Sequence, residues 1–286
     1  MYESLNAAAK GLLGEATAIA QGCNVDFAVC GGWSPFLRNS YVVGHPGTRD
    51  VDLLFSEGSD KGSLKSVVSA FLDSGYIVSA KCEFQVLRIL PVAGRDFVFN
   101  VDLLHPHEGT LAGEFCVDQL SLPIPHEDFK STFVFMKSIA LSNAGFVFDG
   151  YVEDERIVFQ MPNGSCVSLD VPIIDEVGLI ATKGKSCIQR NCPRDIFDIY
   201  LAIKYPRSLD RFKTQLRRLR SEHDGVYASL EYITEGIKAQ TKYHPSEIFA
   251  ERGIKFDDAA KEMQTFIDQL DFSGMNFEME LEPDEE

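Results

Sequence analysis

The chain has 286 residues, of which 45% are apolar and 24% are charged, and its formal net charge is −16. These values are typical of a globular protein with one large or two modest domains. They exclude a membrane-spanning class, because no apolar run approaches the length that a bilayer requires, and the acidic balance argues at first against nucleic acid as a partner.

The start of the chain and the cysteines predict a compartment. Residues 2–6 lack the basic and continuous apolar segments of a signal peptide, so we expect none. The seven cysteines are scattered and none forms a C-x-x-C pair, which makes a zinc site improbable. Free thiols of this kind suit a reducing compartment, and we expect a cytoplasmic location without membrane contact.

The first part of the chain alternates helices and strands. Apolar residues at helical spacing predict a helix over residues 2–21 that ends at Gly22. The following patterns predict a strand over 25–29, a short helix over 33–39, a loop over 40–48, a strand over 50–55, a helix over 64–72 and strands over 76–80, 84–90 and 97–104. This order indicates a mixed sheet rather than a doubly wound parallel one.

Two carboxylates stand at alternate positions on an apolar run, in the stretch Asp50-Val51-Asp52-Leu53. Residues i and i+2 of a strand face the same way, so Asp50 and Asp52 should project together. Side-by-side carboxylates repel each other, and a bound divalent cation removes that cost. The pattern therefore predicts part of a magnesium site.

A third acid lies inside another apolar strand, at Asp102. Asp is disfavoured in the middle of a strand, and buried acids are rare unless they are paired or bind a metal. The alternative is a carboxylate at the solvated edge of the sheet. With Asp50 and Asp52, Asp102 would complete a set of three carboxylates for two Mg²⁺ ions.

Gly31-Gly32 lies between a predicted strand and a predicted helix. Glycines let a phosphate approach the backbone, and a helix N-terminus favours an anion. The sequence here is neither G-x-G-x-x-G nor a P-loop, so dinucleotide and Walker-type sites are excluded. A plain turn is the alternative. Trp33, which follows, either stacks a base or anchors the turn as a buried residue.

The rest of the chain changes in character. Residues 105–125 have the composition of a loop, 129–141 predict a helix, and 146–152, 157–161 and 166–171 predict antiparallel strands, with Pro162-Asn163-Gly164 as a hairpin turn. Helices are predicted near 173–190, 193–204, 207–220, 226–240 and 256–271, followed by a frayed acidic tail. We therefore divide the chain into an α/β core with an antiparallel extension, residues 1–172, and a helical lobe with the tail, residues 173–286.

The order Gly31-Gly32, then Asp50-x-Asp52, then Asp102 resembles the signature of the nucleotidyltransferase superfamily over residues 25–105. The resemblance implies an α+β fold: a nucleotidyltransferase-like mixed β-sheet core with flanking helices, followed here by a helical C-terminal lobe. It also implies transfer of NMP from an NTP onto a hydroxyl, with Mg²⁺, or Mn²⁺ as an alternative, held by Asp50, Asp52 and Asp102.

Residues 176–198 are similar to a block of the AbiEii-like nucleotidyltransferase toxins, including the MenT-type enzymes. Their sequence is E-V-G-L-I-A-T-K-G-K-S-C-I-Q-R-N-C-P-R-D-I-F-D. Lys183, Arg190, Arg194, Asp195 and Asp198 fall on its pattern. The resemblance implies that Lys183 and Asp195 are catalytically important.

The physical roles of this block agree with phosphoryl transfer, which depends on positioning and charge neutralisation. Lys183 would neutralise the triphosphate, and Arg190 and Arg194 would clamp it with planar donors. Asp195 would orient Lys183 or accept the proton of the incoming hydroxyl. The alternative is a lattice of salt bridges between helices.

The loop before Asp50 departs from the family pattern. Thr48 falls where the family has a Ser that contacts phosphate, whereas Pro46, with His45 beside it, replaces the usual Arg. Arg49 is a candidate substitute for that Arg.

Residues 183–220 hold eleven Lys or Arg and only three acids, within an acidic protein. Such a stretch is either a phosphate or nucleic-acid face or a solvated helix surface, and composition alone favours the solvated surface.

The sequence as a whole predicts a Mg²⁺-dependent nucleotidyltransferase that acts on an RNA hydroxyl, such as a tRNA 3′ end, and by resemblance the toxin of a toxin–antitoxin or phage-defence pair with a cognate antitoxin. One alternative is a transferase for a small cationic acceptor of the aminoglycoside type, which suits the charge of −16. Another is a pseudoenzyme that binds a nucleotide without transferring it.

Overall fold

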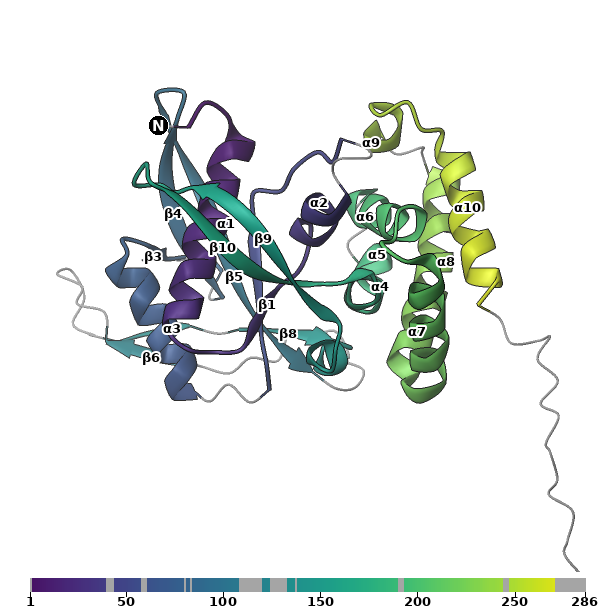
Figure 1. The fold of residues 1–286 in the computed structure, drawn as a ribbon, viewed down its shortest axis with the longest axis horizontal. Helices are drawn as coiled ribbons and strands as arrows, with labels where there is room; N and C mark the ends of the chain where they lie inside the picture. Colours follow the sequence, from purple (N-terminus) through teal and green to yellow (C-terminus); the bar gives the residue numbers. More distant parts are fainter. Residues whose placement is uncertain are drawn as a thin grey trace, which may run out of the picture.

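The computed structural model of this chain describes residues 2–39, 44–57, 61–79, 81–82, 84–107, 120–123, 133–136, 138–189, 193–243 and 247–270. Figure 1 shows a β-sheet with helices against it on the left and a group of helices on the right. Arg190, which was predicted to bind the triphosphate, and the acidic tail after residue 270 lie outside the described residues.

Within the described ranges, the main sheet has eight strands in the order β3-β4-β5-β2-β1-β10-β9, with β8 paired to β5. The strands are β1 (Phe27–Val29), β2 (Val51–Phe55), β3 (Ile77–Val78), β4 (Gln85–Val92), β5 (Arg95–His107), β8 (Ile139–Ser142), β9 (Val152–Gln160) and β10 (Cys166–Ile174). β2 and β8 run parallel to β5 and β1 runs parallel to β10, whereas the other pairs are antiparallel. The predicted mixed sheet is confirmed.

Helices cover both faces of the sheet. One face carries α1 (Leu5–Gly22) and α3 (Lys61–Asp73), and α2 (Trp33–Asn39) lies between the sheet and the helical lobe (Figure 1). The lobe consists of α4 (Glu176–Lys183), α5 (Ser186–Gln189), α6 (Pro193–Lys204), α7 (Leu209–Glu222), α8 (Asp224–Tyr243), α9 (Glu247–Ala250) and α10 (Phe256–Asp268).

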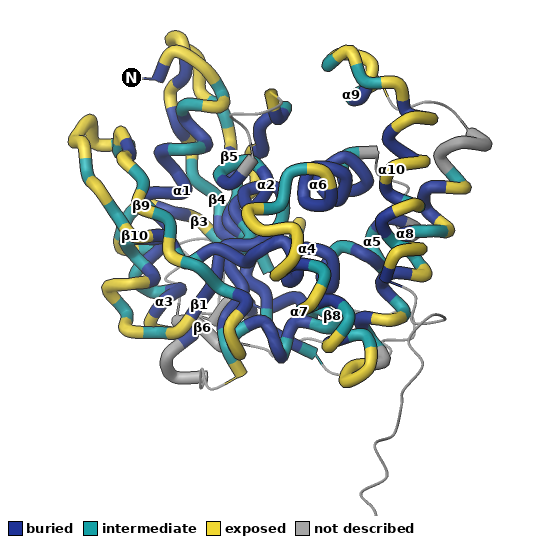
Figure 2. Tube along the Cα trace, turned by 45° about the vertical axis from the view of Figure 1, so that its right-hand side comes forward, coloured by how far each residue is buried: buried dark blue, intermediate teal, exposed yellow. Residues whose placement is uncertain are grey.

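The alternation of β2 and β5 sorts their side chains onto two faces. Val51, Leu53, Val101 and Leu103 are buried in a core shared with α1 and α3. Leu54, on the other face, belongs to a second core that includes residues of α4 and α6. Figure 2 shows the central strands and the helices next to them as buried. Residues that alternate with the first core therefore face the helical lobe.

The helical lobe has an apolar core of its own, built from α4 to α10 together with residues before β9. The change from strands to helices falls between β10 and α4. The division of the chain into domains at residues 172 and 173 stays a prediction. None of the helices in the described ranges combines the length and apolar character that crossing a bilayer requires.

Several predicted elements were wrong. The helix predicted over 129–141 is replaced by β7 (Phe133–Met136) and β8, and β6 (Leu120–Pro123), which pairs with β7, falls in the predicted loop. Residues 145–148 form a 3₁₀ turn rather than a strand, and 173–190 divide into the end of β10, α4 and α5. The hairpin turn at 162–164 is confirmed, since β9 pairs with β10 on either side of it.

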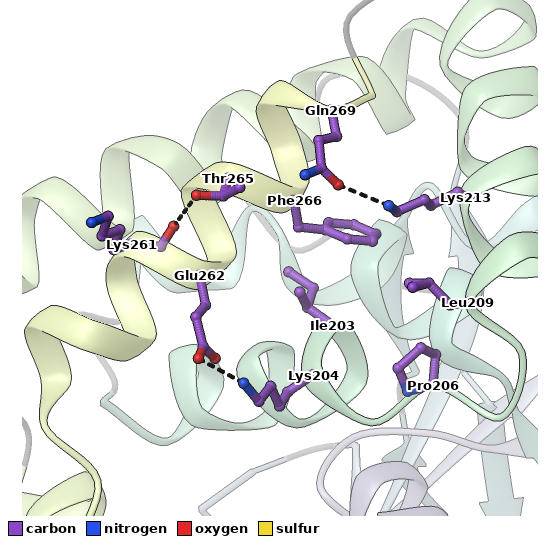
Figure 3. Close-up of a pocket in the computed structure, with 10 residues that line it drawn as sticks. All are labelled: Ile203, Lys204, Pro206, Leu209, Lys213, Lys261, Glu262, Thr265, Phe266 and Gln269. Atoms are coloured by element: carbon purple, nitrogen blue, oxygen red, sulfur yellow. Dashed lines mark hydrogen bonds and ion pairs between the residues drawn. The ribbon is translucent and has the colours of Figure 1, made fainter.

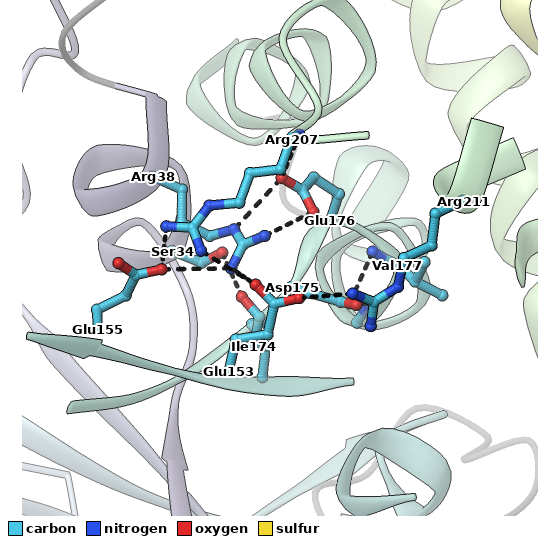
Figure 4. Close-up of polar contacts among 11 residues, drawn as sticks. Ser34, Arg38, Glu153, Glu155, Ile174, Asp175, Glu176, Val177, Arg207 and Arg211 are labelled. Atoms are coloured by element: carbon cyan, nitrogen blue, oxygen red, sulfur yellow. Dashed lines mark hydrogen bonds and ion pairs between the residues drawn. The ribbon is translucent and has the colours of Figure 1, made fainter. Parts of the chain in front are cut away.

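A lattice of charges joins the sheet to the helical lobe (Figure 4). Arg38 of α2, whose side chain is 1% exposed, lies 2.8 Å from Glu153 of β9 and 2.8 Å from Glu176 of α4. Arg207, between α6 and α7, pairs with Glu153 and Glu155. Because each partner comes from a different element, the lattice fixes α2 and α4 against β9.

Candidate active site

The carboxylates predicted to bind a metal lie on adjacent parallel strands. Asp52 of β2 is directly opposite Asp102 of β5 in the register, and Gln85 of β4 is opposite Asp102 on its other side. Asp50 is exposed and immediately precedes β2. Because paired residues point to the same face of a sheet, Asp52 and Asp102 both project toward the helical lobe.

The electrostatics of Asp102 show that the negative charges are not balanced. Burial, followed by the neighbouring Asp52, raises the pKa of Asp102 to about 7, and Asp50 adds to the rise. Asn100 opposes it by donating an amide hydrogen bond of 2.7 Å to Asp102. A cation would favour the charged form, so this set of oxygen donors fits a hard divalent ion.

The carboxylates do not form a closed metal cage as they stand. In the part of the chain that the structure describes, no three His, Cys, Asp or Glu side chains are grouped closely enough to hold a metal ion. The metal site stays a prediction.

The glycine turn packs directly against Asp52. Gly31 has a φ of +66°, and a Cβ added to it would lie 1.9 Å from Asp52 Oδ2. The backbone N–H of Cys30 donates to the Asp52 carbonyl over 3.0 Å. Glycine is required at this position both for the backbone conformation and for the space that the carboxylate occupies.

The backbone of Asp50 is held by two side chains. Its carbonyl accepts hydrogen bonds from Trp33 Nε1 at 2.9 Å and from Thr48 Oγ1 at 3.3 Å. Trp33 is 1% exposed, so it anchors the turn and offers no face for stacking a base. Gly32 packs against Thr48, since a Cβ on it would lie 3.2 Å from that side chain. Arg49 is exposed beside Asp50.

Lys183 is the last residue of α4, and the side chain of Asp175 caps the N-terminus of this helix. Its Nζ donates to Asp195 Oδ1 at 3.0 Å and also to Asp198. Burial opposes the charge on Lys183, but Asp198 and Asp195 outweigh it and raise the pKa of the amine above its ordinary value. The amine is therefore a permanent cation held by two carboxylates of α6.

Asp198 is buried and also contacts the loop before Asp50. His45 Nε2 lies 2.8 Å from Asp198 Oδ1, and both side chains are 0% exposed. Burial alone would raise the pKa of Asp198, yet Lys183 and then His45 lower it below its usual range. The link joins residues that are 153 positions apart in sequence.

The thiol of Cys30 lies between the two halves of the site. Burial raises the pKa of Cys30 well above its ordinary value, Asp52 and Asp102 add to the rise, and Lys183 opposes it. Cys30 packs in one buried cluster with Leu179 of α4. Lys183 lies one helical turn after Leu179, so it is on the face of α4 that packs toward this side of the sheet. Cys30 itself is an inert packing residue.

Two other predicted residues are only partly defined. Arg190 lies outside the described residues. Arg194 is half-buried at the start of α6, next to Asp195. Among described residues, Arg194 Nη2 and Asp195 Oδ2 are buried without a hydrogen-bond partner. Their contact with a triphosphate stays a prediction.

Many of the described cations in the basic stretch have partners within the protein. In α6 and α7, Lys204 pairs with Glu262 and Lys213 donates to Gln269, both on the border of a groove of about 520 Å³ in the helical lobe (Figure 3). The arginines from 207 to 220 contact acids or carbonyl oxygens: Arg207 and Arg211 contact Glu153, Arg217 contacts Gln269, Arg218 contacts Glu222 and Arg220 contacts Leu270. These contacts agree with the solvated helix surface, the alternative that composition favours for this stretch.

Sequence reasoning missed one residue of the site, His45, which it treats only as the neighbour of Pro46. The available signal was its position in the loop that leads to Asp50. Cys30 is the small core residue that its apolar surroundings predict.

Comparisons with known proteins give only weak likenesses. No protein-family model and no curated protein matches the chain. The solution structure of the antibiotic-resistance factor ANT(2'')-Ia is 15% identical, with a TM-score of 0.40, over 78% of this chain and 95% of that one. An antigenic nucleotidyltransferase-like protein from Paracoccidioides brasiliensis is 16% identical, with a TM-score of 0.29, over 76% of this chain and 93% of that one. Likenesses at this level carry no argument about function.

Proposed function

We propose that the protein is a metal-dependent nucleotidyltransferase that transfers NMP from an NTP to an acceptor hydroxyl. One observation carries the proposal: Asp52 and Asp102 are paired on parallel strands, on the face of the sheet against which α4, the helix of Lys183, packs through Leu179 and Cys30. Acidic ligands for a divalent ion and a fixed cation are the two parts that phosphoryl transfer needs.

Each residue has a role in the proposal. Asp50, Asp52 and Asp102 would hold Mg²⁺ or Mn²⁺, which when bound supplies charge neutralisation to the triphosphate. Lys183 uses two of its three N–H donors on Asp195 and Asp198, which leaves one for a phosphate oxygen. Arg190 and Arg194 would add planar donors to the triphosphate, and Thr48 and Gly31-Gly32 would line its approach.

Label transfer from α-labelled NTPs with Mg²⁺ tests this proposal. We expect the native chain to transfer the label. Asp50→Ala removes a metal ligand and Lys183→Ala removes the fixed cation, so both variants should lose transfer. Glu262→Gln, at the surface of the helical lobe, is the control and should transfer normally. Unchanged transfer in both site variants would rule the proposal out.

The metal is tested separately by thermal unfolding. Mg²⁺ relieves repulsion among the carboxylates, so it should raise the melting temperature of the native chain at pH 8 and raise that of Asp52→Asn much less. An equal rise in the two proteins would show that these carboxylates do not bind the ion.

For the acceptor, the resemblance favours RNA, such as a tRNA 3′ end, and with it a toxin role and an antitoxin. A second candidate is a small polycation of the aminoglycoside type. It is favoured by the net charge of −16 and by the internal pairing of the basic stretch, which leaves fewer cations to bind a phosphate backbone.

Parallel reactions with total RNA and with a panel of aminoglycosides separate the two acceptors. Labelled RNA and no labelled aminoglycoside would support the first candidate, and the reverse would support the second. Calorimetric binding of an NTP with Mg²⁺ but no transfer to either would instead indicate a pseudoenzyme.

A further inference from the structure

His45 is a buried residue that makes two hydrogen bonds in opposite directions. Its Nδ1 accepts the backbone N–H of Gly47 at 3.0 Å, and its Nε2 lies 2.8 Å from Asp198 Oδ1. The ring is 0% exposed and packs edge-on against Phe36, with 5.6 Å between the ring centres. The ring therefore has a single orientation.

These contacts define the tautomer. An imidazole nitrogen that accepts an amide hydrogen carries no proton, so the proton of the neutral ring is on Nε2 and is donated to Asp198. Asp198 then accepts from His45 at Oδ1 and from Lys183 at Oδ2. Both oxygens of this buried carboxylate are satisfied, and its orientation is fixed.

We propose that His45 is a positioning residue: through Asp198 it holds Lys183 toward the carboxylates, whereas its bond to Gly47 serves only to fix the tautomer and the orientation of the ring. This inference rests on the proposed function. The chain His45–Asp198–Lys183 joins the loop before β2 to α6 and α4, so one side chain sets the relative position of the two halves of the site.

The buried Asp198 carboxylate depends on both of its donors. Without the Nε2 donor, Oδ1 would be left in an apolar interior without a partner, and the carboxylate would turn toward another donor. Because Asp198 supplies one of the two acceptors of Lys183, such a turn moves the amine. Asp195 alone, at 3.0 Å, does not fix the direction of a flexible lysine.

Two substitutions separate the contacts of His45. In His45→Gln, the amide nitrogen reaches the place of Nε2, so the bond to Asp198 remains and the bond to Gly47 is lost. In His45→Asn, the shorter amide keeps the acceptor for Gly47 and cannot reach Asp198. His223→Gln, at the exposed end of α7, is the matched control.

The first readout is nucleotide transfer. We expect His45→Gln to stay near the native kcat and His45→Asn to lose about 10- to 100-fold in kcat, with little change in KM for the NTP, because a misplaced amine fails mainly in the transition state. Equal loss in the Gln and Asn variants, or loss in the Gln variant alone, would overturn the route through Asp198.

The second readout does not depend on activity. The rate at which an amine-acylating reagent modifies Lys183, followed by mass spectrometry, should be low in the native chain and in His45→Gln and higher in His45→Asn. If His45→Asn does not fold, Asp198→Asn replaces it, because it keeps the size of the side chain and removes the acceptor of Lys183. An unchanged rate in the folded variant would overturn the inference.

The two readouts distinguish a failure of the proposed function from a failure of the inference about His45. If the native chain transfers no nucleotide, the proposed function fails, and the acylation rates still decide whether His45 positions Lys183. If the native chain is active and His45→Asn is equally active, the inference fails and the proposed function stands.

Discussion

At the scale of single residues, the site is dominated by two carboxylates that the sheet forces together. Asp52 and Asp102 are direct neighbours because β2 and β5 are parallel and in register at that point. Asn100 donates to Asp102, yet the pKa of Asp102 is still raised to about 7, mainly by burial. The folded chain therefore holds an electrostatic cost that a bound cation would relieve.

This cost gives a pH dependence of stability. The folded pKa of Asp102 is raised above its unfolded value of 3.8, so the folded state binds more protons between about pH 4 and pH 7, and its stability falls as the pH rises through this range. Asp102→Asn has no carboxyl group to titrate at this position. The free energy of unfolding of this variant, minus that of the native chain, should therefore increase by about 1–3 kcal/mol from pH 4 to pH 8.

Urea unfolding in EDTA measures this difference, because chelation keeps divalent ions from masking the repulsion. An advantage that is constant with pH, or that shrinks as the pH rises, would contradict the assignment of the raised pKa to Asp102.

The contact between Gly31 and Asp52 gives a second prediction. Gly31→Ala should reduce nucleotide transfer by about 10-fold or more, because the new Cβ would displace the Asp52 carboxylate from its place. It should also cost about 1 kcal/mol of stability, since its φ of +66° is strained for alanine.

Gly94→Ala is the matched control for Gly31→Ala. Gly94 has a φ of +80°, but no atom would lie within 4 Å of its new Cβ. Both variants therefore carry similar backbone strain and only one displaces a carboxylate. If the two lose activity equally, strain rather than the position of Asp52 is responsible.

At the scale of elements, β2 and β5 were predictable because their patterns are local. Each apolar run that contains one of these acids forms a strand in the structure, and Asp52 and Asp102 lie on the face opposite the first core, beside the buried Leu54. The segment at 133–142 was not predictable in this way. Its strand β8 is set by pairing with β5, far away in the sequence, and β7 by pairing with β6.

The charge lattice around Arg38 gives an element-scale prediction. Arg38→Ala leaves Glu176 and Glu153 without their main buried partner, so it should lower the free energy of unfolding by about 3 kcal/mol. Arg156→Ala is the control: Arg156 pairs with Asp170 at the surface, where the two side chains are 63% and 56% exposed, and it should cost less than about 1 kcal/mol.

Chemical unfolding of the two variants in parallel measures this difference. Similar small losses would show that the lattice does not fasten α2 and α4 to β9.

At the scale of the whole molecule, the site joins a sheet to a helical lobe. The resemblance predicted that Lys183 and Asp195 belong with the aspartates of the sheet, whereas composition and periodicity gave no such information. The link from His45 to Asp198 was beyond sequence reasoning, because a contact across 153 positions leaves no local pattern. The positive charge of the basic stretch could be read from the sequence, but its partners, such as Glu262 and Glu153, could not, because they lie far away in the sequence.

The most direct test of the central claim follows both products of one reaction, with pyrophosphate release and transfer of the α-label measured together. We predict that the native chain forms them in equal amounts with Mg²⁺, and that Asp52→Asn forms neither. Asp170→Asn, which changes a surface carboxylate of β10, should behave like the native chain. Release of inorganic phosphate without label transfer, or an undiminished rate in Asp52→Asn, would contradict nucleotidyl transfer at this site.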